Sequence, residues 1–266
     1  MTCRPRSVKR PESKRRKPPV SIALTPLQLL GLIVVFAVAR IAISLRPVPA
    51  GVEGKTSATA VAREYLDAFI VAGLVALFLI TFVVRTFYIP SGSMENTLQV
   101  HDVLLVNEFE YRFHQPQHGD IVVFPPPVVT TSDFIKRLIG APGDQFAIRH
   151  GIIFRNGQEV KEPYIKEKPA YDLEIKNCSI IVDGQPLLLD SANIPPKSQW
   201  QACDRIPNGY YFMMGDNRNN SEDSHIWGFA QLHGEFASGQ IKGHKAGFTG
   251  HAFLLFWPLD RIRILK

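Results

Sequence analysis

The sequence predicts a mostly β domain that follows one or two transmembrane helices. Two apolar runs lie in the first third of the 266 residues, and each approaches the roughly 20 residues that cross a bilayer. After residue 98, short runs rich in Val, Ile and Phe alternate with Gly, Pro, Asn and Asp turn signals, which is typical of antiparallel strands. No helical period of any length appears in that part. The chain, 45% hydrophobic, is too apolar to be disordered throughout.

We expect five segments along the chain. They are a basic disordered tail at 1–19, a first apolar segment at 20–46, a linker at 47–64, a transmembrane helix at 65–88 and a β-rich domain at 89–266.

The two apolar runs differ in how strongly they predict a span. The second run, 68–84, holds 17 residues without a charge between Asp67 and Arg85, so it has no polar face to show to water. A buried core helix is the alternative there. The first run, 27–45, contains Arg40, which could reach the interface from near one end. That run is either a second span or an interfacial helix.

The net charge of +6 is concentrated in the tail. Residues 1–19 hold eight Lys or Arg and one Glu, while the other 22 basic and 23 acidic residues sum to −1. A nucleic-acid surface on the folded part is therefore not indicated. A basic tail suits an anionic lipid surface instead.

The cysteines and the acidic residues do not predict a metal site. Cys3, Cys178 and Cys203 lack zinc-ligand spacing. Residues 214–225 form a polar loop rich in Asp and Asn, but they do not match the spacing of a calcium loop. We interpret this loop as a polar network that orients another site. The spacing leaves open whether Cys178 and Cys203 form a disulfide.

Ser93 is the first candidate for chemistry. It lies eight residues after Arg85, so at most about 28 Å of extended chain separates it from the water boundary of the second run. Pro90 and Gly92 favour a sharp turn around the serines at 91 and 93. A Ser-Gly-Ser sequence is more often an ordinary turn, so this segment alone is weak evidence.

Lys136 is the second candidate because it interrupts an apolar strand at 134–140. A lysine on an apolar face is desolvated, which lowers its pKa and makes the neutral amine a competent general base. Ser–Lys pairs are a recognised hydrolytic arrangement. The alternative is an edge-strand lysine whose charge reaches solvent and discourages aggregation.

Taken together, these segments resemble the bacterial type I signal peptidases, which are membrane-anchored Ser–Lys endopeptidases. The matching sequences are IPSGSM with TL at 89–98, GDIVVF at 119–124, FIKR with G-x-PGD at 134–144, and GDNR-x-NS-x-DS at 215–224. The match covers roughly 65–258 and is weak between 155 and 208. Four such sequences in this order after an apolar run are highly specific.

The resemblance implies a role for each matched residue. Ser93 would be the nucleophile and Lys136 the general base that deprotonates it. The other roles would be oxyanion donation by the Ser91 hydroxyl and the Ser93 N–H, orientation of the lysine by Ser221, structural support from Arg137, Asp216, Arg218 and Asp223, and substrate-cleft walls at Ile89, Met94 and Phe134.

The implied substrates are secreted preproteins, cut after signal peptides with small side chains at positions −1 and −3. The resemblance implies no metal or cofactor. It also implies an inner or plasma membrane location in contact with lipid, with the catalytic domain on the extracytoplasmic side. The charge distribution conflicts with two spans, because eight tail cations against three in 46–64 favour a cytoplasmic tail.

The chain departs from the family pattern at two positions. Asn219 stands where the family usually has Asp, and His225 stands where Arg usually follows Asp-Ser. We expect His225 to replace Arg as the partner of Asp223. In the family pattern both positions belong to the supporting ion-pair network and not to the Ser–Lys pair.

Two other functions remain open from the sequence. One is a cytosolic Ser–Lys self-cleaving repressor protease, which the run at 65–88 argues against. The other is a non-catalytic envelope β domain that only binds peptides. The sequence does not predict an oligomeric state.

Overall fold

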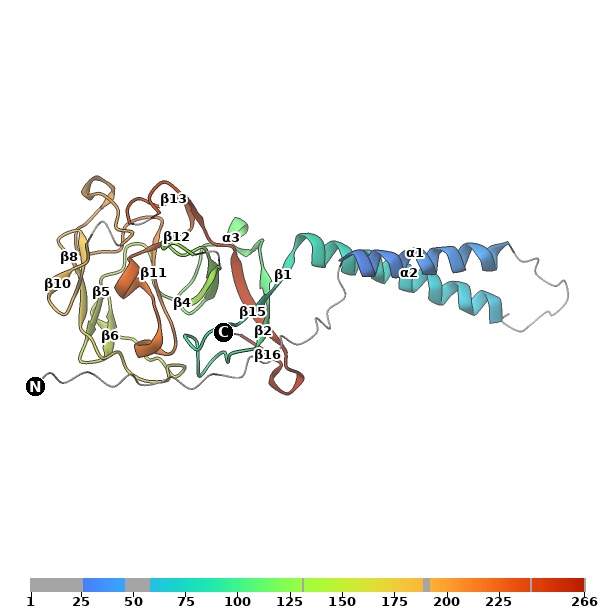
Figure 1. Ribbon diagram of the computed structural model, residues 1–266, viewed down its shortest axis with the longest axis horizontal. Helices are drawn as coiled ribbons and strands as arrows, with labels where there is room; N and C mark the ends of the chain where they lie inside the picture. Colours follow the sequence, from blue (N-terminus) through green and yellow to red (C-terminus); the bar gives the residue numbers. More distant parts are fainter. Residues whose placement is uncertain (1–25, 46–57, 131, 189–191, 240, 266) are drawn as a thin grey trace, which may run out of the picture. The chain divides into compact units, whose positions relative to one another are not determined.

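The computed structural model describes residues 26–45, 58–130, 132–188, 192–239 and 241–265 (Figure 1). The chain forms two compact units, residues 1–79 and 80–266. The expected tail at 1–19 lies outside the described residues, as do Cys3 and most of the expected linker.

The first unit contains two antiparallel helices. Helix α1 spans Pro26–Ser44 and α2 spans Ala58–Phe82, and both consist mainly of Ala, Leu, Val, Ile and Phe. The two helices run side by side in Figure 1. The rings of Phe36 and Phe69 lie 5.6 Å apart, and Arg40 pairs with Asp67 at 2.8 Å. Arg40 is therefore neutralised by the neighbouring helix.

Within the described residues, α1 is the one helix that is long and apolar enough to cross a membrane, over Leu27–Ser44. Its apolar side chains are largely exposed, among them Val34, Val35 and Val38, as expected of a helix that faces lipid. Helix α1 is therefore a candidate membrane anchor in the first apolar segment. A second span by α2 remains a prediction.

The expected boundaries of the second helix are wrong at both ends. The helix begins at Ala58 instead of residue 65, because the Ala-rich stretch before it favours helix. It ends at Phe82, and Val84–Tyr88 is a strand, β1. The β-branched and aromatic residues of β1 pair antiparallel with β2. The β-rich part therefore begins several residues before residue 89.

The second unit is built on an eight-stranded antiparallel sheet in the order β1-β2-β15-β3-β4-β11-β12, with β16 paired to β15. Its other strands are β2 Val103–Asn107, β3 Ile121–Phe124, β4 Phe134–Gly140, β11 Tyr210–Met214, β12 Ala230–Gln231, β15 Gly250–Trp257 and β16 Arg263–Ile264. The prediction of a mostly β fold is confirmed.

A second, six-stranded sheet has the order β10-β9-β8-β5-β6-β7. Its strands are β5 Phe146–Arg149, β6 Ile152–Arg155, β7 Gln158–Glu159, β8 Leu173–Lys176, β9 Ser179–Val182 and β10 Gln185–Pro186. The β9–β10 hairpin turns at Asp183 and Gly184, both with positive φ, as an Asp-Gly pair favours.

The remaining elements are short. They are the two-stranded sheet of β13 His233–Glu235 and β14 Lys245–Gly247, helices α3 Glu110–Phe113 and α4 Ser224–Trp227, and 3₁₀ turns η1 Lys197–Gln199, η2 Arg218–Asn220 and η3 Leu259–Arg261.

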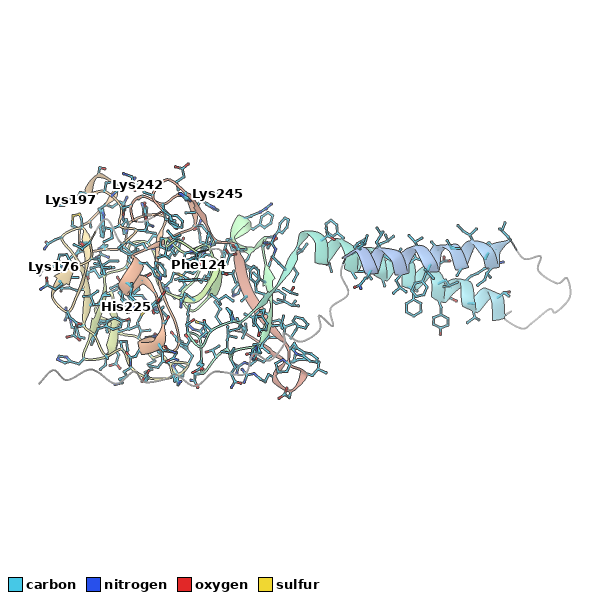
Figure 2. All side chains as sticks on the ribbon, viewed as in Figure 1. Phe124, Lys176, Lys197, His225, Lys242 and Lys245 are labelled. Carbon is cyan, nitrogen blue, oxygen red and sulfur yellow. A yellow bond between two sulfur atoms is a disulfide. The ribbon has the colours of Figure 1, made fainter. Side chains whose placement is uncertain are left out.

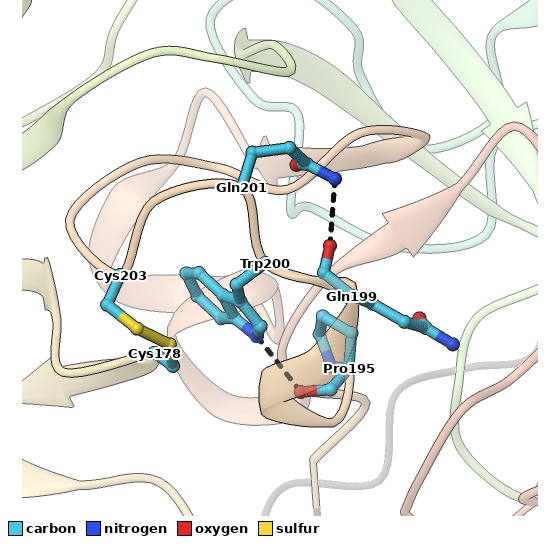
Figure 3. Close-up of a disulfide and its surroundings, with 6 residues drawn as sticks. All are labelled: Cys178, Pro195, Gln199, Trp200, Gln201 and Cys203. Carbon is cyan, nitrogen blue, oxygen red and sulfur yellow. Dashed lines mark hydrogen bonds between the residues drawn. A yellow bond between two sulfur atoms is a disulfide. The ribbon is translucent and has the colours of Figure 1, made fainter.

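A disulfide joins Cys178 to Cys203, which answers the question that the sequence left open. Figure 3 shows it beside Trp200, whose indole N–H donates to the carbonyl of Pro195 at 3.0 Å. Cys178 and Trp200 belong to the apolar core of the second sheet. The disulfide thus ties the turn between β8 and β9 to a distant loop.

The labelled lysines and the labelled phenylalanine of the β domain differ in their exposure to solvent. Lys176, Lys197, Lys242 and Lys245 lie on its outside in Figure 2 and are exposed. Phe124 lies inside the domain and is buried. A buried lysine in this domain is therefore an exception that needs a physical reason.

Candidate active site

A groove of about 1040 Å³ runs along the second unit. Three segments far apart in the sequence line it: residues 87–94 after β1, residues 132–136 at the start of β4, and residues 219–222 with 225–226. The groove therefore brings Ser91, Ser93, Lys136 and Ser221 to one cavity.

The turn at 90–94, which we call the serine turn, is anchored by apolar residues. Ile89 and Met94 are 3% and 1% exposed and pack in the core beneath it. Ser91 and Ser93 remain accessible, with their hydroxyl oxygens 3.5 Å apart. The backbone N–H of Asn217 donates to the carbonyl of Ser93 at 3.0 Å, so the serine turn is joined to the polar loop.

Lys136 is buried in the groove wall with 3% exposure. Its Nζ donates to Ser221 Oγ at 2.8 Å and lies 5.4 Å from the ring centre of Phe134. Burial lowers the pKa of Lys136 to about 8, and Asp223 is the first of the carboxylates that oppose this shift. In the described structure no direct hydrogen bond joins Nζ to Ser93. Catalytic hydrogen bonds often tighten only once substrate is bound.

Arg137 points to the opposite side of β4 from Lys136. Its Nε and Nη2 donate to the two carboxylate oxygens of Asp216 at 2.9 and 2.8 Å. Its Nη1 donates to the carbonyl of Gly119 at 2.7 Å. The Asp216 carboxylate also accepts from the Thr97 hydroxyl. This buried ion pair is fully hydrogen-bonded, so it holds the two segments together without being reactive.

Asp223 is fully buried and organises the end of the polar loop. It accepts from the N–H of Gly215 at 3.1 Å and caps α4 through the N–H of His225. The His225 ring nitrogen Nδ1 also contacts it. The expected replacement of Arg by His225 thus corresponds to a real contact. The ring of Tyr171 stacks on His225 at 4.3 Å.

Asn219, the other departure from the family pattern, also has partners. Its side-chain oxygen accepts from the N–H of Ala170 at 2.8 Å, and its Nδ2 donates to the carbonyl of Lys168 at 3.0 Å. An aspartate could not make the second bond, because a carboxylate only accepts.

Sequence reasoning missed Glu162 and Tyr164. Glu162 forms a buried bidentate ion pair with Arg218, and the Tyr164 ring lies 3.9 Å beneath the Arg137 guanidinium. Both residues lie in the stretch where the family match is weak. No pattern in that stretch signals that it contacts a loop more than 50 residues away.

Among the described residues, no group of three or more His, Cys, Asp or Glu side chains could hold a metal ion. The groove is lined by the hydroxyls of the serine turn and of Ser221, by the buried amine of Lys136, and by the side chains of Asp133, Glu222 and His225. Among these, a hydroxyl and a buried amine are the groups that a serine peptidase with a lysine base uses.

Comparison with known proteins gives the same class. Residues 62–241 match the family model described as signal peptidase, peptidase S26. The chain is 36% identical to a probable signal peptidase I-1 of Synechocystis, over 75% of this chain and 84% of that protein. It is 32% identical to a signal peptidase I of Pseudomonas aeruginosa, over 73% of each chain.

A crystal structure of a signal peptidase I from Enterococcus faecalis V583 is 29% identical, covering 44% of this chain and 91% of that chain with a TM-score of 0.30. On the family and sequence matches, the chain belongs to the S26 family of signal peptidases. Its enzyme class is therefore that of the serine endopeptidases.

Proposed function

We propose that this chain removes signal peptides from secreted preproteins with Ser93 as nucleophile and Lys136 as general base. The observation that carries the assignment of residues is a buried lysine in the same groove as an accessible serine turn. With its pKa lowered to about 8, this amine is partly neutral near physiological pH and can accept a proton.

Ser221 orients the base. Its hydroxyl accepts a hydrogen bond from Nζ, which limits the directions in which the amine lone pair can point after deprotonation. The ring of Phe134, two residues earlier in β4, lies beside the amine. Water exclusion by these neighbours keeps the pKa low, so the position and the basicity of Lys136 have a common origin.

The reaction then follows the acyl-enzyme route. Lys136 removes the hydroxyl proton of Ser93 as the oxygen attacks the carbonyl carbon of the scissile bond. The Ser91 hydroxyl and the Ser93 N–H donate to the oxyanion of the tetrahedral intermediate. The ammonium of Lys136 protonates the leaving amine, and a water molecule, activated by the same base, hydrolyses the ester.

The substrate is proposed to bind as an extended chain beside the groove. Its backbone would pair with 88–94 and with 134–136, because β11 already pairs with β4 from Arg137 onward. The edge of β4 at 134–136 that faces away from β3 has no such partner strand in the described register. Alternate substrate side chains would then meet Ile89, Met94 and Phe134, which supports selection of small residues.

The proposed location is the inner or plasma membrane, with the catalytic domain on its extracytoplasmic side. Helix α1 provides the anchor. The disulfide in the β domain supports this side, because disulfides form and persist mainly in oxidising compartments. Tethering at the membrane raises the effective concentration of the enzyme near its lipid-embedded substrates.

The test is cleavage of a preprotein with an Ala-x-Ala signal-peptide end by the full chain in detergent. Ser93→Ala and Lys136→Ala should each lower kcat by about a thousandfold or more. The matched controls are Ser198→Ala and Lys197→Ala, two exposed residues outside the groove, and these should cleave normally. Cleavage by Ser93→Ala at the normal rate would refute the assignment. Peptide binding by a wild-type chain that does not cleave would favour a binding domain.

A further inference from the structure

A segment that connects two strands of the six-stranded sheet contacts the loops of the candidate site. Residues 162–171, which we call the strap, connect β7 to β8 and belong to neither sheet. Two loops contact it: the serine turn with the residues that follow it, and the polar loop at 215–225. The mechanism above uses no residue of the strap.

The strongest contact is the ion pair of Glu162 with Arg218. The Arg218 side chain is fully buried and that of Glu162 is 5% exposed. Two parallel hydrogen bonds of 2.7 and 2.5 Å join them, and Arg218 Nε donates to the carbonyl of Gly215 at 3.0 Å. Glu162 therefore fixes the side chain that holds the start of the polar loop.

Further contacts extend this attachment to both loops. The N–H of Lys166 donates to the carbonyl of Asp216 at 2.9 Å, and its Nζ pairs with Glu95 at 2.6 Å. The Nδ2 of Asn96 donates to the carbonyl of Tyr164 at 2.9 Å. The strap thus connects the segment that follows Ser93 with the loop that carries Ser221.

Both departures from the family pattern face this same segment. Asn219 bonds the backbone of Lys168 and Ala170, and His225 stacks on Tyr171. Two independent side chains of the polar loop are therefore matched to the strap of this particular chain.

We infer that the strap is a positioning element of the active site, and that Glu162 of the strap and Asn219 of the polar loop are positioning residues. Neither touches the groove serines or Lys136. They act through the polar loop, which presents Ser221 to Lys136 and covers the amine. This inference rests on the proposed function.

The first test is Glu162→Gln in the full chain in detergent, with kcat, KM and the pH profile of kcat/KM measured on the same preprotein. A neutral glutamine leaves the Arg218 charge unpaired, so the polar loop should loosen and admit water to Lys136. We expect kcat to fall by about 10- to 100-fold with KM nearly unchanged. The acid limb of the profile should move to higher pH, because burial is the main cause of the lowered pKa.

The second test is Asn219→Asp, which restores the residue usual in the family. In this chain it should lower kcat several-fold, because a carboxylate would face the Lys168 carbonyl without a proton to donate. The control is Lys161→Gln, an exposed neighbour of Glu162, which should leave kcat and the profile unchanged.

Unaltered kcat in Glu162→Gln, or a loss without movement of the acid limb to higher pH, would overturn the inference. If Glu162→Gln does not fold, Asn219→Asp is the deciding variant. Wild-type kcat in Asn219→Asp would overturn the inference. If Ser93→Ala loses cleavage and Glu162→Gln keeps the wild-type kcat, the positioning role of the strap is refuted and the proposed function stands.

Discussion

The two faces of β4 carry adjacent buried cations with opposite electrostatic environments. Arg137 is 1% exposed and makes two hydrogen bonds to Asp216. Lys136 is 3% exposed, and the hydrogen bond of its amine goes to the neutral hydroxyl of Ser221. Carboxylates act on Lys136 through space, and burial outweighs them.

This difference distinguishes a charge that orders the chain from one that suits the proposed catalytic role. A guanidinium in a bidentate pair stays protonated and orders the chain around it. An amine that is buried with only a hydroxyl as hydrogen-bond partner gives up its proton readily, and it can then act as a base.

The largest effect is expected for Lys136→Arg. Arginine keeps its proton at every working pH, so the base would be lost although the positive charge remains. We expect kcat to fall by about a thousandfold or more, measured by preprotein cleavage. Activity within tenfold of the wild type would show that position 136 needs a positive charge and not a base.

On the face of β4 that carries Arg137, Asp216→Asn should destabilise the β domain. The substitution removes the counter-ion of the buried Arg137, which costs about 3–5 kcal/mol. Chemical denaturation of the detergent-solubilised chain, followed by near-UV circular dichroism, measures this. A change below about 1 kcal/mol would mean that the guanidinium is not held by this pair.

Lys136→Met should raise the stability of the folded state, by less than Asp216→Asn lowers it. The buried ammonium destabilises the folded state below pH 8, because its pKa falls from 10.5 unfolded to about 8 folded. Its removal should stabilise the inactive variant by up to about 3 kcal/mol at pH 6–7. The gain should shrink between pH 8 and 10.5, where the wild type sheds the charge. Thermal unfolding at several pH values checks this, and a destabilised variant at pH 6 would contradict it.

The smallest effect is expected for His225→Arg. A fixed charge beside Asp223 offsets the carboxylate that raises the pKa of Lys136. The acid limb of kcat/KM, expected near pH 8 in the wild type, should move down by a few tenths of a pH unit. An identical profile would show that His225 has no electrostatic link to the base.

The residues of the candidate site could be proposed from the sequence because the evidence for them is local. Ser93 lies in a turn that contains Pro90 and Gly92, and Lys136 interrupts an apolar strand. Glu162 was missed because its partner Arg218 is 56 residues away, in a region without a recognisable pattern. The start of the second helix was misplaced because turn-forming residues nearby obscured its Ala-rich first turn.

The order of an apolar segment and a β domain follows from the amino-acid sequence, since hydropathy and strand periodicity are properties of neighbouring residues. Which side chains cover each face of β4 depends on the three-dimensional fold. Asp216 is 79 residues from Arg137, and Ser221 is 85 residues from Lys136. Alternation along a strand separates the two side chains, but sheet topology sets what packs against each one. That packing lowers the pKa of Lys136 and holds Arg137 in its ion pair.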